Sequence, residues 1–279
     1  MKWVSFKDNS RLTFGLVTDQ GIADAGSRTE YDTLKQAIAA QALGSIAQEL
    51  EGGADVSLGD VELLPVIPDP AKILCVGLNY RAHQEETGRG GEGYPTIFTR
   101  FASSQVGHEG AMVRPAESSK LDFEGEIALI VGRRGRRIAK SQALDYVAGF
   151  SCYNDGSVRD YQRHTSQFTP GKNFDRTGGF GPWMMTPDEI GDLQAMEITT
   201  RLNGEVMQNA TAAQMVFDFA TLIEYCSEWA TLEPGDVIVT GTPGGVGVAR
   251  NPRVFMEAGD VVEISVSPIG TLRNTIAPG

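Results

Sequence analysis

Strand-like segments dominate the chain after residue 70 and limit the possible folds more than any other feature. They are rich in apolar and β-branched residues, and glycine, proline or Asn-Gly pairs separate them, at 72–80, 95–101, 126–132, 146–154, 196–208, 236–243 and 260–270. Helices are predicted at 139–147 and 213–229, the second because Val216, Phe219 and Ile223 recur at helical spacing. The pattern indicates a mixed, β-rich α/β fold with few helices.

A proline-rich segment divides the chain. Three prolines lie between positions 65 and 70, in LLPVIPDPAK, and interrupt regular structure. Before them, 2–6 and 12–18 are predicted to be paired strands and 33–50 a helix capped by Asp32. We predict a small N-terminal α+β domain at 1–67 and a larger domain at 68–279.

The charge of the chain argues against nucleic acid as a partner. Among 279 residues, 24 basic side chains face 36 acidic ones, which gives a net charge of −12, and no basic stripe carries interleaved aromatic residues. The one basic cluster, RRGRR at 133–137, follows a strand and is predicted to be a solvated loop.

Cysteine use and hydropathy give an expected location. Cys75, Cys152 and Cys226 are widely spaced and lie in or beside apolar segments, which is typical of buried free thiols in a reducing compartment. The N-terminus lacks the apolar core of a signal peptide, and no stretch approaches the ~18 apolar residues of a membrane span. We expect a soluble cytoplasmic protein with no membrane partner.

Three acidic residues are candidate metal ligands. Glu124 and Glu126 are two apart in a predicted strand, so their side chains project from the same face. Asp155 ends a second predicted strand, and the three carboxylates would converge if the two strands are neighbours. A set of oxygen ligands favours Mg²⁺, Mn²⁺ or Ca²⁺ over zinc. The alternative is a pair of acids on a solvated strand face.

His83 and Glu86 are a candidate catalytic pair. Their i, i+3 spacing places both on one face of a short helix, where the carboxylate could orient the imidazole as a general base. The alternative is a surface ion pair. The following segment GRGGEG, at 88–93, is nearly free of side chains and is either the hinge of a lid or a flexible surface loop.

Several polar residues in loops are candidate substrate contacts. Lys172 lies among glycines and prolines, where it could bind a carboxylate or an enolate oxygen, and Arg159 and Gln162 closely follow Asp155. The alternative for each is solvation. The segment TGTPGGVG at 240–247 does not open a helix, so a dinucleotide site is not indicated, and Thr242 with its neighbouring amides could hold a carboxylate.

Taken in order, these motifs resemble the fumarylacetoacetate hydrolase family. The resemblance covers roughly residues 70 to 276, through KILCVGLNYRAH, LDFEGEIALIVG, YVAGFSCYNDGSVRD, GKNFD, GPW, LNGEVMQ and LEPGDVIVTGTPGGVG. It implies the mixed β-sheet roll or sandwich of that family, a homodimer, and a divalent cation, Mg²⁺ or else Mn²⁺ or Ca²⁺, bound by Glu124, Glu126 and Asp155.

The resemblance also implies roles for other residues. His83 and Glu86 match the pair that activates water, Lys172 matches the lysine facing the reacting carbonyl or enolate, and Gln162 and Thr242 match residues near the substrate. One position departs from the family pattern, because Arg100 stands where many members have lysine. The planar, permanently charged guanidinium predicts contact with a different or larger acid group of the substrate.

The primary functional hypothesis is hydrolysis of a carbon–carbon bond in a 1,3-diketo acid, of the acylpyruvate or fumarylacetoacetate kind, in the catabolism of aromatic compounds or sugars. Decarboxylation of an oxaloacetate-type β-keto acid, or isomerisation of a hydroxymuconate-type acid, would use the same metal and enolate chemistry. A binding protein without catalysis and an NAD-dependent oxidoreductase are the alternatives from other classes. In each enzymatic case the expected substrate is a small anionic keto acid.

Overall fold

Two β-sheets packed face to face form the body of the molecule. The computed structural model describes residues 1–50, 53–90 and 93–279. The larger sheet runs in the order β3 (Gly21–Asp24), β2 (Arg11–Thr18), β1 (Lys2–Asp8), β13 (Gly178–Met185), β11 (Val147–Asn154), β10 (Gly125–Val131), β16 (Val237–Val239), β5 (Ile73–Gly77) and β6 (Thr96–Arg100). Two short strands, β4 (Glu62–Leu63) and β7 (Gln105–Val106), pair with β1 and β13.

The smaller sheet supplies the second layer. Its order is β15 (Glu205–Thr211), β14 (Glu197–Leu202), β17 (Val261–Val266), β18 (Gly270–Pro278) and β8 (Met112–Arg114). Apolar side chains of both sheets, such as Leu129 and Ile264, share one buried cluster. A separate pair, β9 (Leu121–Asp122) with β12 (Ser157–Val158), lies beside the site. The predicted β-rich mixed fold is confirmed.

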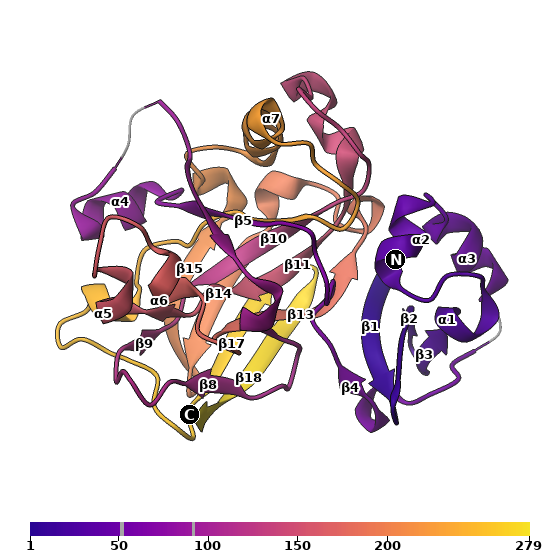
Figure 1. The fold of residues 1–279 in the computed structure, drawn as a ribbon, viewed down its shortest axis with the longest axis horizontal. Helices are drawn as coiled ribbons and strands as arrows, with labels where there is room; N and C mark the ends of the chain where they lie inside the picture. Colours follow the sequence, from indigo (N-terminus) through magenta and orange to yellow (C-terminus); the bar gives the residue numbers. More distant parts are fainter. Residues whose placement is uncertain (51–52, 91–92) are drawn as a thin grey trace.

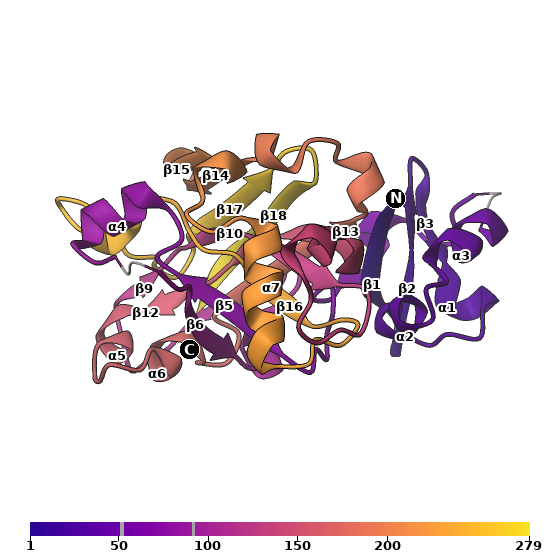
Figure 2. The same ribbon diagram turned by 90° about the horizontal axis from the view of Figure 1, so that it is seen from above.

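The longest helix, α7 (Phe219–Trp229), lies against the larger sheet near β5 and β16 (Figure 2). Its buried face packs into the main core, where Phe219 meets Phe150 of β11 edge-on at a centroid distance of 5.0 Å. Three short helices, α4 (Arg81–Thr87), α5 (Arg159–Gln162) and α6 (Thr169–Lys172), gather at the end of the molecule opposite the N-terminal strands (Figure 1). That end carries the candidate site.

The N-terminal part is joined to the rest through the larger sheet. Strand β1 pairs antiparallel with β13, with Trp3 opposite Met184. Trp3 also shares a buried cluster with Ile130 and Phe180, which belong to the larger sheet beyond the proline-rich segment. The helices α1 (Ala25–Arg28), α2 (Leu34–Ala39) and α3 (Leu43–Glu49) cover this end. The domain division at 67 stays a prediction.

The predicted helix at 33–50 is wrong in two details. It is two helices, α2 and α3, because Gln41 between them adopts φ = 55° and its side-chain amide donates to the carbonyls of Ile38 and Gly132. The N-cap is Thr33, whose hydroxyl accepts the Gln36 N–H, whereas the Asp32 N–H donates to the Gln36 side chain. Thr33, and not the predicted Asp32, therefore caps the first of the two helices.

Two other predicted helices are shorter or tighter than expected. The segment at 139–147 forms a 3₁₀ helix over Lys140–Tyr146. The helix predicted at 213–229 begins at Phe219, because the Asp218 carboxylate accepts the Thr221 N–H and starts it there. A short 3₁₀ turn, Ala212–Gln214, precedes it.

Simpler predictions from composition agree with the structure. The three cysteines are buried and free. The basic cluster at 133–137 is tied down as well as solvated, since Arg134 pairs with Glu233 and Arg136 donates to the Ser227 carbonyl. None of the helices in the described ranges is long and apolar enough to cross a membrane.

Gly125, between the two predicted acidic ligands, lies in close contact with the second sheet. A Cβ at this position would lie 2.0 Å from the Thr200 hydroxyl of β14 and 3.1 Å from the Ile264 side chain of β17. No side chain larger than hydrogen fits without moving the Thr200 side chain. The absence of a side chain on this face lets β10 sit deep enough to present Glu124 and Glu126 on the other.

Gly125→Ala is expected to destabilise the protein by about 1–3 kcal/mol through overpacking. Gly44→Ala in α3 is the matched control, because a Cβ there meets nothing within 4 Å; it should leave stability unchanged or raise it by up to about 1 kcal/mol. Urea unfolding of both variants measures the difference. Equal stability of the two variants would show that the sheet contact at Gly125 is not tight.

Candidate metal centre and active site

The three predicted acidic ligands converge at the junction of β10 and β11. These strands are antiparallel neighbours, with Gly125 opposite Asn154, and the Asp155 N–H donates to the Glu124 carbonyl at 2.9 Å. One carboxylate oxygen from each of Glu124, Glu126 and Asp155 lies within 4.8 Å of the others, and all three residues are buried. The predicted juxtaposition is confirmed.

Two cations neutralise part of this acidic cluster. The Lys172 Nζ lies 2.6 Å from Glu124 Oε2 and 2.5 Å from Asp155 Oδ2, and Arg159 Nη1 lies 2.6 Å from Glu124 Oε1. Burial raises the pKa of Glu124, but Lys172 and Arg159 outweigh burial and lower this pKa below its usual range. Burial likewise lowers the pKa of Lys172, and Asp155 and Glu124 raise it above its usual range. Lys172 is therefore an ammonium ion, a donor rather than a base.

Glu126 is the least compensated of the three acids. It accepts the Gly241 N–H at 2.5 Å, and no lysine or arginine of the described residues pairs with it within 4.0 Å. Burial, followed by the negative charges of Asp155 and Glu124, raises the pKa of Glu126 well above its usual range. A divalent cation would relieve this repulsion, and a buried site with only oxygen ligands suits Mg²⁺ or Mn²⁺. The residues present therefore fit a hard cation.

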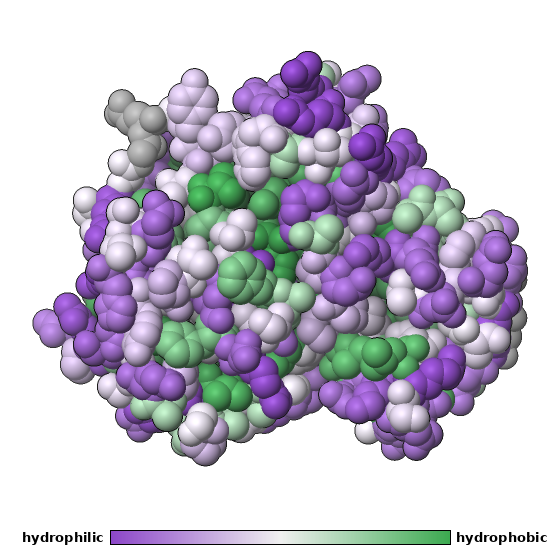
Figure 3. Space-filling model, in the orientation of Figure 1, coloured by the Kyte–Doolittle hydropathy of each residue, from purple (hydrophilic) through white to green (hydrophobic). Residues whose placement is uncertain are grey.

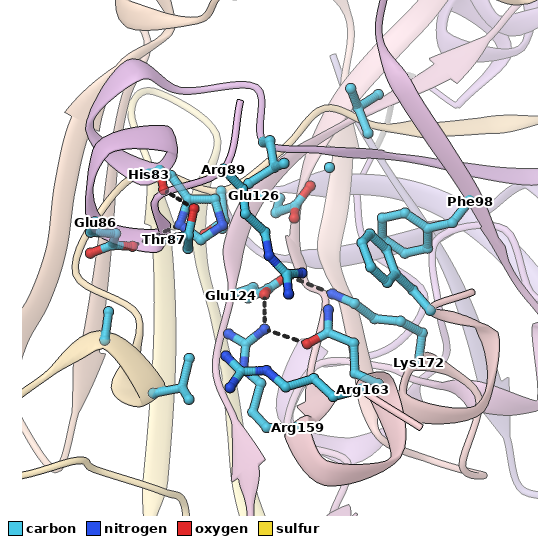
Figure 4. A pocket seen from close by; sticks show the side chains of 18 residues that line it. His83, Glu86, Thr87, Arg89, Phe98, Glu124, Glu126, Arg159, Arg163 and Lys172 are labelled. Atoms are coloured by element: carbon cyan, nitrogen blue, oxygen red, sulfur yellow. Dashed lines mark hydrogen bonds and ion pairs between the residues drawn. The ribbon is translucent and has the colours of Figure 1, made fainter. Parts of the chain in front are cut away.

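Glu124 and Glu126 open onto a cavity of about 270 Å³ (Figure 4). Its size suits a small metabolite rather than a cofactor the size of a dinucleotide. Eight predicted site residues line it together, namely His83, Glu86, Glu124, Glu126, Arg159, Gln162, Lys172 and Thr242, whereas the fully buried Asp155 is not among the lining residues. Phe98, Phe168 and Val76 supply apolar wall, and Lys172 Nζ lies 4.9 Å from the centroid of the Phe98 ring.

His83 and Glu86 form the predicted pair on α4. The His83 Nδ1 and Glu86 Oε1 atoms are 2.7 Å apart, and the second oxygen of Glu86 accepts the Gly245 N–H at 2.8 Å. Glu86 thus fixes the imidazole and ties α4 to the loop at 240–248, which leaves Nε2 of His83 for the cavity. Of the segment at 88–93, Gly91 and Glu92 lie outside the described residues, so the hinge stays a prediction.

The glycine-rich loop at 240–248 donates backbone hydrogen bonds to the carboxylates of the site. Its amides donate to Glu126 from Gly241, to Glu86 from Gly245, and to Asp122 from Gly247 and Val248. A three-residue 3₁₀ helix, Gly247–Ala249, follows, in place of the long helix of a dinucleotide site. The loop therefore positions carboxylates of the protein itself.

Thr242 is held by its neighbours although it borders the cavity. Its hydroxyl donates to the Gly125 carbonyl at 2.9 Å and accepts from the Gln208 amide at 2.8 Å. The predicted contact between Thr242 and a substrate carboxylate would compete with both bonds. Gln162 is also engaged, since its Oε1 accepts from Arg159 Nη1 at 3.0 Å.

The structure corrects the expected position of Arg100, which does not line the cavity. Its side chain is fully buried behind Asp155, where Nη1 lies 2.7 Å from Asp155 Oδ1 and 3.0 Å from the Gly156 carbonyl. The remaining nitrogens donate to Ser104 and Thr177. With every face of the guanidinium occupied, Arg100 orients an acid of the metal centre and is not placed to contact a substrate.

Sequence reasoning missed three residues of the site. Asp122 accepts a hydrogen bond from Arg159 Nε at 2.8 Å. In the sequence LDFEGE, Asp122, Glu124 and Glu126 stand at every second position, so the same strand spacing that identified the two glutamates also indicated Asp122. Arg89 and Arg163 line the cavity. Neither sits in a chemical motif, and only the fold brings them to the same opening as the acids.

Comparisons with known proteins identify the relatives of this chain. A family model described as fumarylacetoacetate (FAA) hydrolase C-terminal matches residues 72–277. Oxaloacetate tautomerase YisK of Bacillus subtilis (strain 168) is 41% identical over 225 residues, which cover 79% of this chain and 74% of that protein.

Solved structures agree over the whole chain. The fumarylacetoacetate hydrolase of psychrophilic Exiguobacterium antarcticum is 34% identical with a TM-score of 0.85, and each chain is covered to 100%. The maleylpyruvate hydrolase from Sphingobium sp. SYK-6, in complex with manganese(II) ion and pyruvate, is 27% identical with a TM-score of 0.84, again over 100% of both chains.

Proposed function

Because this chain belongs to the fumarylacetoacetate hydrolase family, we propose that it is a metal-dependent enzyme that interconverts the keto and enol forms of oxaloacetate. The observation that carries the proposal is one cavity lined by Glu124 and Glu126 of the acidic cluster, by Lys172 and by His83. The name of the relative that is 41% identical supports this oxaloacetate-type alternative over the hydrolytic hypothesis.

Glu124, Glu126 and Asp155 would hold a divalent cation, which supplies Lewis-acid polarisation of a 2-oxo group when it is bound. A manganese ion and pyruvate in the maleylpyruvate hydrolase complex support such a pairing, and magnesium is the cation we propose to test first.

Side chains of the site would transfer the C3 proton of oxaloacetate, away from carbon in enolisation and back to carbon in ketonisation. In enolisation, His83 takes a proton from C3, the C3–H electron pair becomes the C2=C3 double bond, and the carbonyl π pair moves onto the oxygen at C2. That oxygen then takes a proton from solvent, and the His83 imidazolium releases its proton to solvent, so that no proton is gained or lost. Glu86 stabilises the imidazolium that forms, at 2.7 Å from Nδ1. Lys172, kept charged by Asp155 and Glu124, donates to the developing enolate oxygen. Ketonisation is the reverse.

Hydrolysis of a diketo acid is the second candidate. The same His83 would take a proton from water instead of from carbon, and the maleylpyruvate hydrolase with a TM-score of 0.84 supports this use of the fold. Decarboxylation of oxaloacetate would use the same enolate stabilisation. The three reactions differ in their products and not in the residues they need.

A product assay separates these reactions. With oxaloacetate and Mg²⁺ or Mn²⁺, we expect acceleration of enol–keto exchange above the rates of the free metal and of the enzyme with chelator, without release of CO₂. Stoichiometric CO₂ would assign decarboxylation. Cleavage of acylpyruvates into two acids, with no effect on oxaloacetate, would assign hydrolysis and refute the proposal.

We also propose that the protein is a homodimer, as the family resemblance suggests, and that it acts in the cytoplasm, which its buried free cysteines favour. Several large apolar side chains stand exposed in the described ranges, among them Leu12, Tyr94, Phe101, Val206 and Trp229. Figure 3 shows, as a separate observation, hydrophobic residues gathered near the middle of one face. Light scattering at several concentrations measures the mass, and a monomer at all of them would contradict the dimer.

A further inference from the structure

Two arginines that line the cavity form no ion pair with any acid of the described residues. Arg89 follows the end of α4, where Gly88 turns the chain in the left-handed region at φ = 62°, and Arg163 follows α5 directly. Both residues line the cavity. Within the described part of the chain, neither guanidinium has a carboxylate oxygen within 4.0 Å, although the chain carries a net charge of −12.

These guanidinium groups gather around the acidic cluster and Arg159. In Figure 4, Arg89 reaches from the side of α4 toward Glu124, and Arg163 extends toward Arg159. Burial, and then the positive charges of Arg159 and Arg89, lower the pKa of Arg163 below its usual range. Like charges this close repel one another, so the arrangement favours an anion that lies between them.

Arg159 adds a second sign of an expected anion. Its Nε and Nη1 atoms bind Asp122, Glu124 and Gln162. Its Nη2 is buried and has no hydrogen-bond partner among the described residues. An unsatisfied buried donor is costly, and a guanidinium donor is suited to a carboxylate oxygen. The three arginines thus line one side of the cavity, where Arg159 also pairs with Glu124.

Resting on the proposed function, we propose that Arg163 and Arg89 bind the distal carboxylate of the substrate, so that the site selects 2-oxo dicarboxylates over 2-oxo monocarboxylates. The keto acid end of the molecule would face the acidic cluster and Lys172, and the far carboxylate would face the two arginines. A planar guanidinium reads a carboxylate through two parallel hydrogen bonds, which makes it a specificity element.

The test compares Arg163→Gln and Arg89→Gln with Arg253→Gln. Arg253 is the matched control, because its charge also acts on Arg163 but its side chain does not line the cavity. The substrates are oxaloacetate and acetylpyruvate, which has a methyl ketone in place of the distal carboxylate. We expect Arg163→Gln to lower kcat/KM for oxaloacetate by about 10–100-fold, mainly through KM, because charge-assisted hydrogen bonds are lost. The value for acetylpyruvate should change by less than about 3-fold.

Binding without turnover gives an independent readout. Titration calorimetry with Mg²⁺ should show a weaker affinity of Arg163→Gln for malate, which carries a distal carboxylate, and an unchanged affinity for oxalate, a dianion without one. If Arg163→Gln lost equal affinity for malate and oxalate, or if Arg253→Gln lost as much affinity for malate, the effect would come from the overall positive charge near the cavity. Either result would overturn the inference. If the native protein binds malate in this way but does not enolise oxaloacetate, the proposed function fails and the inference about the arginines survives.

Discussion

Replacing Glu126 with glutamine is expected to remove metal-dependent turnover of oxaloacetate down to the rate of the free metal. Glutamine keeps the shape of the side chain, and its carbonyl oxygen can still accept the Gly241 N–H, which lies 2.5 Å from Glu126 Oε2. The change removes the negative charge of the least compensated acid in the cluster. The affinity for Mg²⁺ or Mn²⁺ should fall by at least about 10–100-fold, the loss typical of even the outer residues of metal sites.

Thermal unfolding gives a readout that does not depend on catalysis. A cation at 100 times its Kd stabilises the native protein by about 2.7 kcal/mol, and this gain should disappear in Glu126→Gln. Without metal, the variant should be at least as stable as the native protein, because the buried carboxylate repels Asp155 and Glu124. Glu205→Gln, at an exposed position that begins β15, is the control. Full metal stabilisation of Glu126→Gln would exclude this residue as a ligand.

The arrangement of the metal centre was predictable because it depends on strand periodicity. Glu124 and Glu126 had to share a face if their segment formed a strand, and β10 and β11 are neighbours, so Asp155 joins them. His83 and Glu86 were equally accessible to sequence reasoning, since helical spacing brings i and i+3 together. Short-range geometry carried the two pairs, and the place of Asp155 depended in addition on the pairing of β10 with β11.

Contacts between distant segments were not predictable in the same way. Arg100 was expected to face the substrate, and the path of β6 beside β5 instead buries it behind Asp155, 55 positions along the chain. The amides of the loop at 240–248 reach Glu86, Asp122 and Glu126 only because β16 lies between β10 and β5. Gln41 breaks the predicted N-terminal helix through a hydrogen bond to Gly132, a partner 91 positions away.

Replacing His83 with alanine is expected to lower kcat for enol–keto exchange by about 10²–10⁴-fold, the usual contribution of a general base. His83 is the one imidazole that lines the cavity among the described residues, and Lys172 cannot replace it because Asp155 and Glu124 keep the ammonium charged. Stopped-flow measurement of the enol absorbance, with saturating Mg²⁺, gives the rate.

The variant must keep its metal centre for the result to concern proton transfer. His83 is no part of the acidic cluster, so His83→Ala should bind Mg²⁺ within about 3-fold of the native affinity, in contrast to Glu126→Gln. His164→Ala, at an exposed histidine outside the cavity, should keep full activity. Glu86→Gln should give a smaller loss than His83→Ala, because the imidazole stays in place while the charge that stabilises its protonated form is removed. Unchanged kcat in His83→Ala would assign the proton to another group and leave the acidic cluster as the only supported part of the mechanism.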